Sequence, residues 1–281
     1  MNRIARILRI AGYLWGVKDP RELFSEIRSK DIVFFDTETT GLDQHEKQIT
    51  QIAAIRVHGD NFKESGRFHK KIELTEKTNQ QIQEEKGSDD GKTWTVERSL
   101  KETKYHELDV PAIEEMQALE EFKEFCERSP SYLVAHNAKF DMQMVGTRIG
   151  KINTLGVHDT MMFTRMFFIP ALKALAVEGD EKAKTAIQAM TNAKGKASST
   201  LGSVAKALDV SMSTAHTAIG DVETTARVLE SIMNYIEDKA EAIESEEYEE
   251  ERRKSVSKEK YFTKKNKEQR IQKRKDYRKL K

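Results

Sequence analysis

Apolar residues change their spacing several times along the chain, and each spacing predicts a different element. Residues 32–35 form a continuous apolar run, which is typical of a central strand buried on both faces. The segments Ile49 to Val57 and Arg67 to Leu74 follow after short links and predict an antiparallel meander. Helical spacing then alternates with short strands. The predicted helices span residues 112–128, 140–149, 201–208 and 218–237, and the later strands span 132–135 and 157–159.

Three strands followed by alternating helices and strands predict an α/β fold, a mixed sheet flanked by helices. The body is expected at residues 31–236, with polar insertions near 76–108 and 170–200. Residues 1–30 predict an N-terminal amphipathic helical extension. This extension could dock on its own domain, bind a membrane surface or act as a transit peptide.

The end of the chain carries strongly segregated charge, although the net charge of all 281 residues is only +1. Within residues 237–281, an acidic stretch precedes a basic one in which fifteen Lys and Arg residues face three acids. This tail is either a solvated charged helix or an arm that attracts polyanions.

The single cysteine, Cys126, excludes an intramolecular disulfide and a cysteine-rich zinc site. A reducing compartment suits this composition. No uninterrupted apolar run approaches the 18 or more residues of a membrane span. The sequence therefore predicts a soluble, cytoplasmic protein without a membrane span.

Carboxylates follow the apolar run directly, at Asp36 and Glu38. Side chains alternate along a strand, so both acids project from the same face. Two like charges at the end of a dry strand resist joint ionisation unless a cation lies between them. The pair predicts a divalent metal site, although a strand end can also expose both acids to water.

Three further residues lie at helix starts and could join this site. Asp141 is expected in the first turn of the helix after strand 132–135, where the helix dipole favours an acid. Asp221 is expected in the first turns of a later helix, with His216 on its approach. Taken singly, each has an ordinary alternative: a cap, a dipole partner or an uninvolved histidine.

Three motifs in order carry a resemblance to a known family: FDTETTGL from Phe35, AHNAKFD from Ala135 and HTAIGD from His216. They resemble the DEDD superfamily of 3′–5′ exonucleases, in the histidine-bearing branch that includes the proofreading epsilon subunit of bacterial DNA polymerase III. Asp159 and Thr160 also match a recurrent element of the family.

The resemblance implies a ribonuclease H-like fold in which four acids hold two Mg²⁺ or Mn²⁺ ions, with His216 as the general base. The implied metal ligands are Asp36, Glu38, Asp141 and Asp221. It also implies contacts to the terminal nucleotide, which are expected from Thr39, Leu42, Asn137 and Phe140. Phe140 could equally anchor its helix in the core, and Asn137 could be a turn residue.

The family's Gly-Ile-Thr turn is absent, and the polar segment 76–108 occupies its place. The expected partners are nucleic acid 3′ ends, with DNA favoured over RNA, and a polymerase or another replication or repair protein. An RNA exonuclease is the alternative, because spacing does not reveal how a pocket treats the 2′-hydroxyl. A catalytically inert nucleic-acid-binding scaffold would be expected to lack at least one of the acids, and all are present.

Overall fold

The computed structural model describes residues 20–86, 94–212, 216–242 and 245. Its centre is a six-stranded sheet of order β4-β3-β2-β1-β5-β6. The strands β1, β2 and β3 form the predicted antiparallel meander, whereas β5, β6 and β4 join by parallel pairing, which gives the mixed sheet expected from the sequence. The strands are β1 (Asp31–Thr39), β2 (Ile49–His58), β3 (Glu64–Ile72), β4 (Ala112–Ile113), β5 (Ser131–Ala135) and β6 (Gly156–Asp159).

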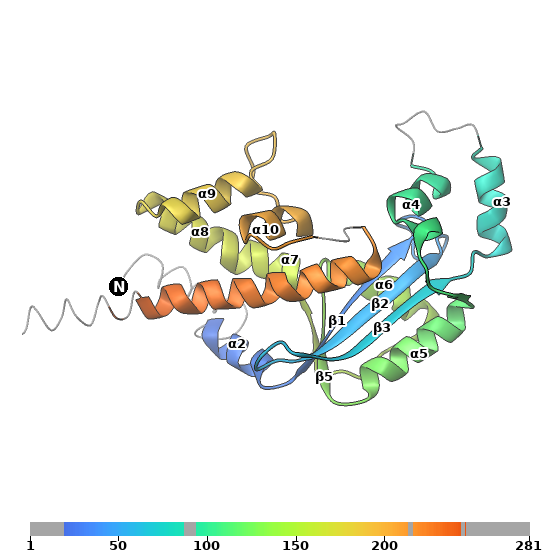
Figure 1. The fold of residues 1–281 in the computed structure, drawn as a ribbon, viewed down its shortest axis with the longest axis horizontal. Coiled ribbons are helices and arrows are strands. Elements are labelled where there is room, and N and C mark those ends of the chain that lie inside the picture. Colours follow the sequence, from blue (N-terminus) through green and yellow to red (C-terminus); the bar gives the residue numbers. More distant parts are fainter. Residues whose placement is uncertain (1–19, 87–93, 213–215, 243–244, 246–281) are drawn as a thin grey trace, which may run out of the picture.

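The apolar run of β1 is fully buried and serves two cores, one on each face of the sheet. Val33 and Phe35 pack with α5 (Glu115–Glu127) and α6 (Ala138–Ile149). Ile32 and Phe34 point the other way and pack with helix 218–242, which crosses the opposite face (Figure 1). Period-two alternation therefore makes β1 the middle layer of a three-layer α/β structure.

The single cysteine, Cys126, is buried on the α5 face of the sheet. Burial raises the pKa of its thiol to about 12. The thiol therefore stays protonated in the folded chain near neutral pH.

The packed body begins before Asp31, at α2 (Pro20–Arg28). Phe24 and Ile27 have no exposed surface and belong to the same core as helix 218–242. The sequence prediction placed this segment in the N-terminal extension, whereas in the structure it packs on the body. Pro20 begins the helix, where its missing N–H costs nothing. The amphipathic segment before it lies outside the described residues.

Segment 76–108, predicted as a polar insertion, folds into short helices with a small apolar cluster of their own. Val96, Leu100 and Tyr105 are buried together there, against Leu74 and Ile82. The elements are α3 (Glu76–Glu84), α4 (Val96–Glu102) and the 3-10 turn η1 (Tyr105–Glu107).

The next element differs from its prediction at the start. Ala112 and Ile113 do not begin the helix but form β4, which pairs with β3, and α5 starts at Glu115. Met116, in the first turn of α5, is 40% exposed. A two-residue strand leaves no periodic signal, so spacing alone assigned it to the helix.

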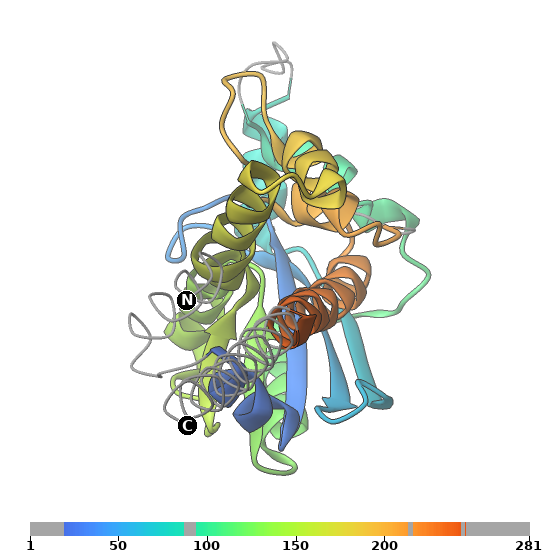
Figure 2. The same cartoon turned by 90° about the vertical axis from the view of Figure 1, so that its left-hand side faces the viewer.

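Most of the described residues between β6 and helix 218–242 are helical, and α8, α9 and α10 lie together as one group in both views (Figures 1 and 2). Its run Thr160–Val177 is, among the described residues, the one helix long and apolar enough to cross a membrane by length and composition. Half of that run is buried in the protein, as in a core helix. The elements are α7 (Thr160–Phe163), the π-helical η2 (Thr164–Phe168), α8 (Ile169–Val177), α9 (Glu181–Met190) and α10 (Leu201–Ala207).

Helix 218–242 extends past the predicted limit of the body at residue 236 and is tied down at its far end. Glu237 pairs with Arg28 of α2 at 3.0 Å, and Lys239 pairs with Asp180 beside α9 at 2.8 Å. The start of the predicted acidic tail therefore packs on the body. The basic part of the tail lies outside the described residues.

Candidate active site

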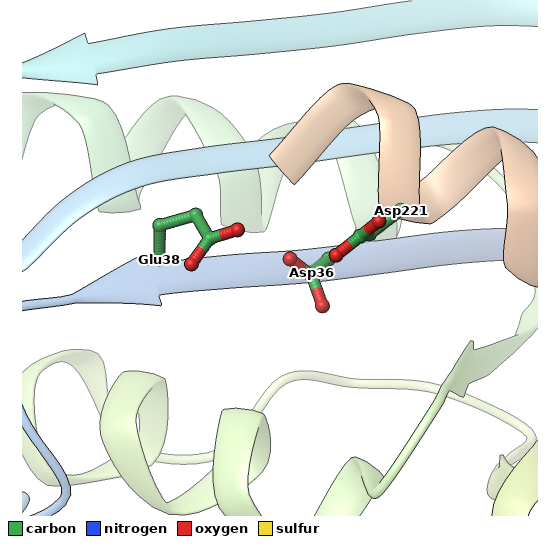
Figure 3. A group of neighbouring side chains, drawn as sticks. All are labelled: Asp36, Glu38 and Asp221. Carbon is green, nitrogen blue, oxygen red and sulfur yellow. The ribbon is translucent and has the colours of Figure 1, made fainter. Parts of the chain in front are cut away.

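Three carboxylates from two distant parts of the chain converge beside β1. Asp36, Glu38 and Asp221 each offer one carboxylate oxygen, and these oxygens lie within 4.8 Å of one another. Figure 3 shows Asp36 and Glu38 on β1, with Asp221 reaching over the strand from helix 218–242. The alternation of β1 that buries its apolar run also turns residues 36 and 38 toward the same helix.

Asp221 is held in place by the first turn of its helix. Its backbone N–H donates to the carbonyl of Thr217 at 3.0 Å. Its Oδ1 is buried and has no hydrogen-bond partner among the described residues. Buried acceptors are nearly always satisfied, so this oxygen indicates a ligand such as a cation.

Asp141 lies in the first turn of α6 and is 3% exposed. Its Oδ1 accepts two hydrogen bonds from Thr37, one from the backbone N–H at 2.9 Å and one from Oγ1 at 2.7 Å. The parallel pairing of β5 with β1 stops at Phe34, and Asp141 satisfies a β1 donor beyond that point. Asp141 thus lies beside the group of three carboxylates, which does not include it.

Burial and mutual repulsion raise the pKa of these acids. Burial raises the pKa of Asp36 well above its ordinary value, and Asp141, Glu38 and Asp221 raise it further. The pKa of Glu38 rises to about 8, mainly through burial and then through Asp221 and Asp141. Burial raises the pKa of Asp141 to about 7 against the effect of the Thr37 hydrogen bonds.

These residues fit a hard divalent cation. All the donors are carboxylate oxygens, which is the ligand type that Mg²⁺, Mn²⁺ and Ca²⁺ prefer. A cation would remove the repulsion that keeps the acids from ionising together. The unpartnered Oδ1 of Asp221 adds a free lone pair to the same donor set.

His216 adopts a left-handed backbone, with φ of 65°, immediately before the helix that carries Asp221. Its side chain is exposed. Burial raises the pKa of Asp221, and the His216 charge and a hydrogen bond from its backbone oppose this rise. His216 therefore lies near the acids, and its role as a base stays a prediction.

The residues predicted to meet the substrate surround the end of β1 and the start of α6. Thr39 Oγ1 donates to the carbonyl of Gly41 at 2.7 Å, and Leu42 is 85% exposed in the same turn. Asn137 is exposed and left-handed, with φ of 72°. Phe140 is partly buried and packs against the α5–α6 core, so its anchoring alternative has support. Their contacts to a nucleotide stay predictions.

Two polar residues support the site and were not predicted. Thr37 fixes Asp141, as described above, and the fully buried Gln51 accepts a hydrogen bond from the Ala218 N–H at 3.3 Å. A signal existed for each, since Gln51 interrupts an apolar strand and Thr37 separates the two acids of β1. Asp159 has a structural role, because its Oδ1 accepts hydrogen bonds from the N–H groups of Asn137 and Met161.

A mixed sheet of this order, with converging carboxylates on its central strand, defines the class of ribonuclease H-like nucleases. Residues 33–229 match the RNase T exonuclease family, so the chain belongs to this exonuclease family. It is an exonuclease of the DEDD type, as the motifs indicated. Enzymes of this family depend on divalent metal.

Individual relatives agree with this assignment. DNA polymerase III PolC-type from Staphylococcus aureus is 31% identical over 143 residues, which cover 50% of this chain and 9% of that protein. The chain thus spans about a tenth of the length of these curated relatives.

Solved structures show the same fold at low identity. E. coli exonuclease I in complex with a dT13 oligonucleotide aligns with a TM-score of 0.53 and 18% identity, covering 76% of this chain and 43% of that one. The zinc-bound form of an E. coli exonuclease I complex with single-stranded DNA aligns at 0.50 and 15%, covering 74% and 41%. The ribonuclease H-like architecture expected from the motifs is therefore confirmed.

Proposed function

We propose that the chain hydrolyses DNA from its 3′ end and releases nucleoside 5′-monophosphates. The observation that carries this proposal is the convergence of Asp36, Glu38 and Asp221 within 4.8 Å, in a chain of the exonuclease family. DNA is favoured because the curated relatives at 31% identity are DNA polymerases.

Asp36, Glu38, Asp141 and Asp221 would hold two Mg²⁺ or Mn²⁺ ions. When bound, such a pair lowers the pKa of a water and stabilises the charge of the leaving oxygen. For Asp141 to join, it would act through the carboxylate oxygen that Thr37 does not engage.

The protein's own groups do the rest. The imidazole of His216 accepts the proton of the attacking water. With this role, the chain would belong to the histidine-bearing branch of the superfamily. The turn from Thr39 to Leu42 and the side chains of Asn137 and Phe140 bind the terminal nucleotide and align its phosphodiester.

The test is digestion of 5′-labelled DNA and RNA oligomers of the same sequence, single- and double-stranded, by wild type and Glu38→Ala, in Mn²⁺ and in EDTA. We expect a ladder shortened from the 3′ end with DNA and wild type, and none with Glu38→Ala or EDTA. Faster hydrolysis of RNA would make the chain an RNA exonuclease. Equal products from Glu38→Ala would refute the site.

The same proposal includes a cellular setting. We expect this chain to work in the cytoplasm beside a polymerase or another replication or repair protein. Pull-down of this chain with a replicative polymerase would test the partnership, and a free chain with full activity would argue for a stand-alone role.

A further inference from the structure

Segment 76–108 is attached to the strand that carries Asp36 and Glu38. The hydroxyl of Ser99 in α4 donates to the carbonyl of Thr39, the last residue of β1, at 2.6 Å. Figure 1 shows α4 lying beyond the end of β1. The segment that replaces the family's Gly-Ile-Thr turn therefore borders the catalytic acids.

One buried side chain also joins this segment to the helix of Asp221. Gln51 Nε2 donates to the carbonyl of Thr103 at 2.7 Å, and its Oε1 accepts from the Ala218 N–H at 3.3 Å. Lys104 is the next residue after Thr103. Its backbone is thus placed close to the start of helix 218–242.

Lys104 has an unusual backbone conformation, left-handed with φ of 55° and ψ of 31°. Both of its neighbours, Thr103 and Tyr105, are buried, and Tyr105 donates from its hydroxyl to the carbonyl of Ile72 at 2.8 Å. A left-handed backbone is less favourable for lysine than for glycine, because the Cβ atom of lysine crowds the following carbonyl oxygen. Backbone strain of this kind persists where the surroundings impose it, and it gathers at functional sites.

The side chain of Lys104 is partly exposed, and no ion pair among the described residues engages its ammonium group. Through Gln51, its neighbour Thr103 is joined to the start of the helix that carries Asp221, which brings Lys104 near that acid. Burial raises the pKa of Asp221, and the charge of Lys104 is one of the influences that oppose this rise. The ammonium group of Lys104 thus lies beside the candidate active site, which receives a polyanion, and no described carboxylate forms an ion pair with it.

We propose that Lys104 is a substrate-positioning residue, which binds a backbone phosphate of the nucleic acid next to the scissile bond. This inference rests on the proposed function and adds to it a contact supplied by segment 76–108. The ammonium of lysine is a compact point charge suited to a phosphate oxygen. The left-handed turn lies between two buried neighbours, and it fixes the point at which this side chain leaves the backbone.

Lys104→Gly tests the inference without straining the fold. Glycine accepts the left-handed conformation, so the variant should melt at or above the wild-type temperature. Lys104→Arg keeps the charge. Lys101→Ala is the matched control, since Lys101 is an exposed lysine on α4 of the same segment. All three are made in the full chain.

Binding of single-stranded dT12 is measured by anisotropy from 50 to 300 mM NaCl, with Asp141→Asn in every protein to prevent hydrolysis. We expect Lys104→Gly to bind on the order of tenfold more weakly at low salt, as for one lost hydrogen bond to a charged group. Its plot of log affinity against log salt should flatten by about 0.7, the value of one phosphate contact on a single strand. Lys104→Arg and Lys101→Ala should keep the parent slope.

Two results would overturn the inference: an unchanged slope for Lys104→Gly, or an equal loss for Lys101→Ala. The Mn²⁺ concentration needed for DNA hydrolysis is measured in Lys104→Gly with Asp141 intact. A change in that concentration at an unchanged salt slope would make Lys104 a charge partner of Asp221 and would also overturn the inference. Failure of the proposed function is seen separately, as wild type that binds dT12 but releases no mononucleotide.

Discussion

Removing divalent metal should make the stability of this protein fall as the pH rises, because the acids of the site then repel one another. The pKa of Glu38 is raised from 4.5 to about 8 in the folded chain. Between these values the folded state binds more protons than the unfolded state, so the free energy of unfolding decreases with pH. Glu38→Gln removes the contribution of Glu38 to this dependence, because glutamine does not ionise.

The raised pKa of Glu38 sets how much the free energy of unfolding falls between pH 5 and pH 8. One pKa unit corresponds to about 1.4 kcal/mol, so the Glu38 shift sets an upper limit of about 5 kcal/mol. Asp36 and Asp141 share the same repulsion, and their contributions overlap with that of Glu38. We therefore expect Glu38 alone to lower the free energy of unfolding by about 2–3 kcal/mol. For a domain of this size, that loss corresponds to roughly 5–10 °C in melting temperature.

The assay is thermal unfolding in EDTA from pH 5 to pH 9, for wild type and Glu38→Gln. The partly buried His136 and His158 have lowered pKa values, mainly through desolvation, and act with the opposite sign. The informative quantity is therefore the difference between variant and wild type. It should grow in favour of Glu38→Gln from pH 5 to pH 8, and saturating Mg²⁺ should abolish the growth. A difference that stays constant with pH in EDTA would refute the electrostatic account.

Three further predictions follow from named contacts. Thr37→Val removes the hydroxyl that donates to Asp141 at 2.7 Å, so kcat should fall about tenfold, whereas Thr37→Ser should stay near wild type. Equal kcat values for Thr37→Val and wild type would contradict the role of Thr37 in positioning Asp141. In His216→Asn, the asparagine tolerates the left-handed backbone. Steady-state digestion should show kcat lowered at least about 100-fold, with little change in the affinity for dT12. A retained kcat excludes His216 as the base. Phe24→Ala should cost about 3–5 kcal/mol in urea unfolding, since Phe24 is fully buried and stacks with Phe163 at 6.0 Å; a loss below about 1 kcal/mol would mean that α2 is not part of the core.

Local patterns predicted those parts of the fold in which neighbours along the chain determine the structure. The apolar run of β1 implied burial on both faces, and the spacing of Asp36 and Glu38 implied a shared direction, both of which the structure shows. Asp221 of helix 218–242 was added to this pair in the prediction because the motifs, rather than the spacing of residues, linked distant segments. Asp141 was expected among the ligands, and it lies beside the group of three.

What local patterns missed depends on contacts between distant residues. The nine residues of α2 look like part of an amphipathic extension until the contacts of Phe24 with Phe163 and Phe167 are known. Segment 76–108 was predicted as a polar insertion because its apolar cluster is small and is completed by Leu74. Gln51 gave no sign that its two hydrogen bonds would join segment 76–108 to helix 218–242.

The buried Cys126 makes this protein convenient for fluorescence work. Its thiol is protonated and enclosed, so maleimide dyes should leave the native folded chain unlabelled. A cysteine introduced at an exposed place, such as Val177 at the end of α8, would take up dye at a single known point. Single-molecule traces of a tagged nucleic acid strand shortening on the protein then need no cysteine-free background.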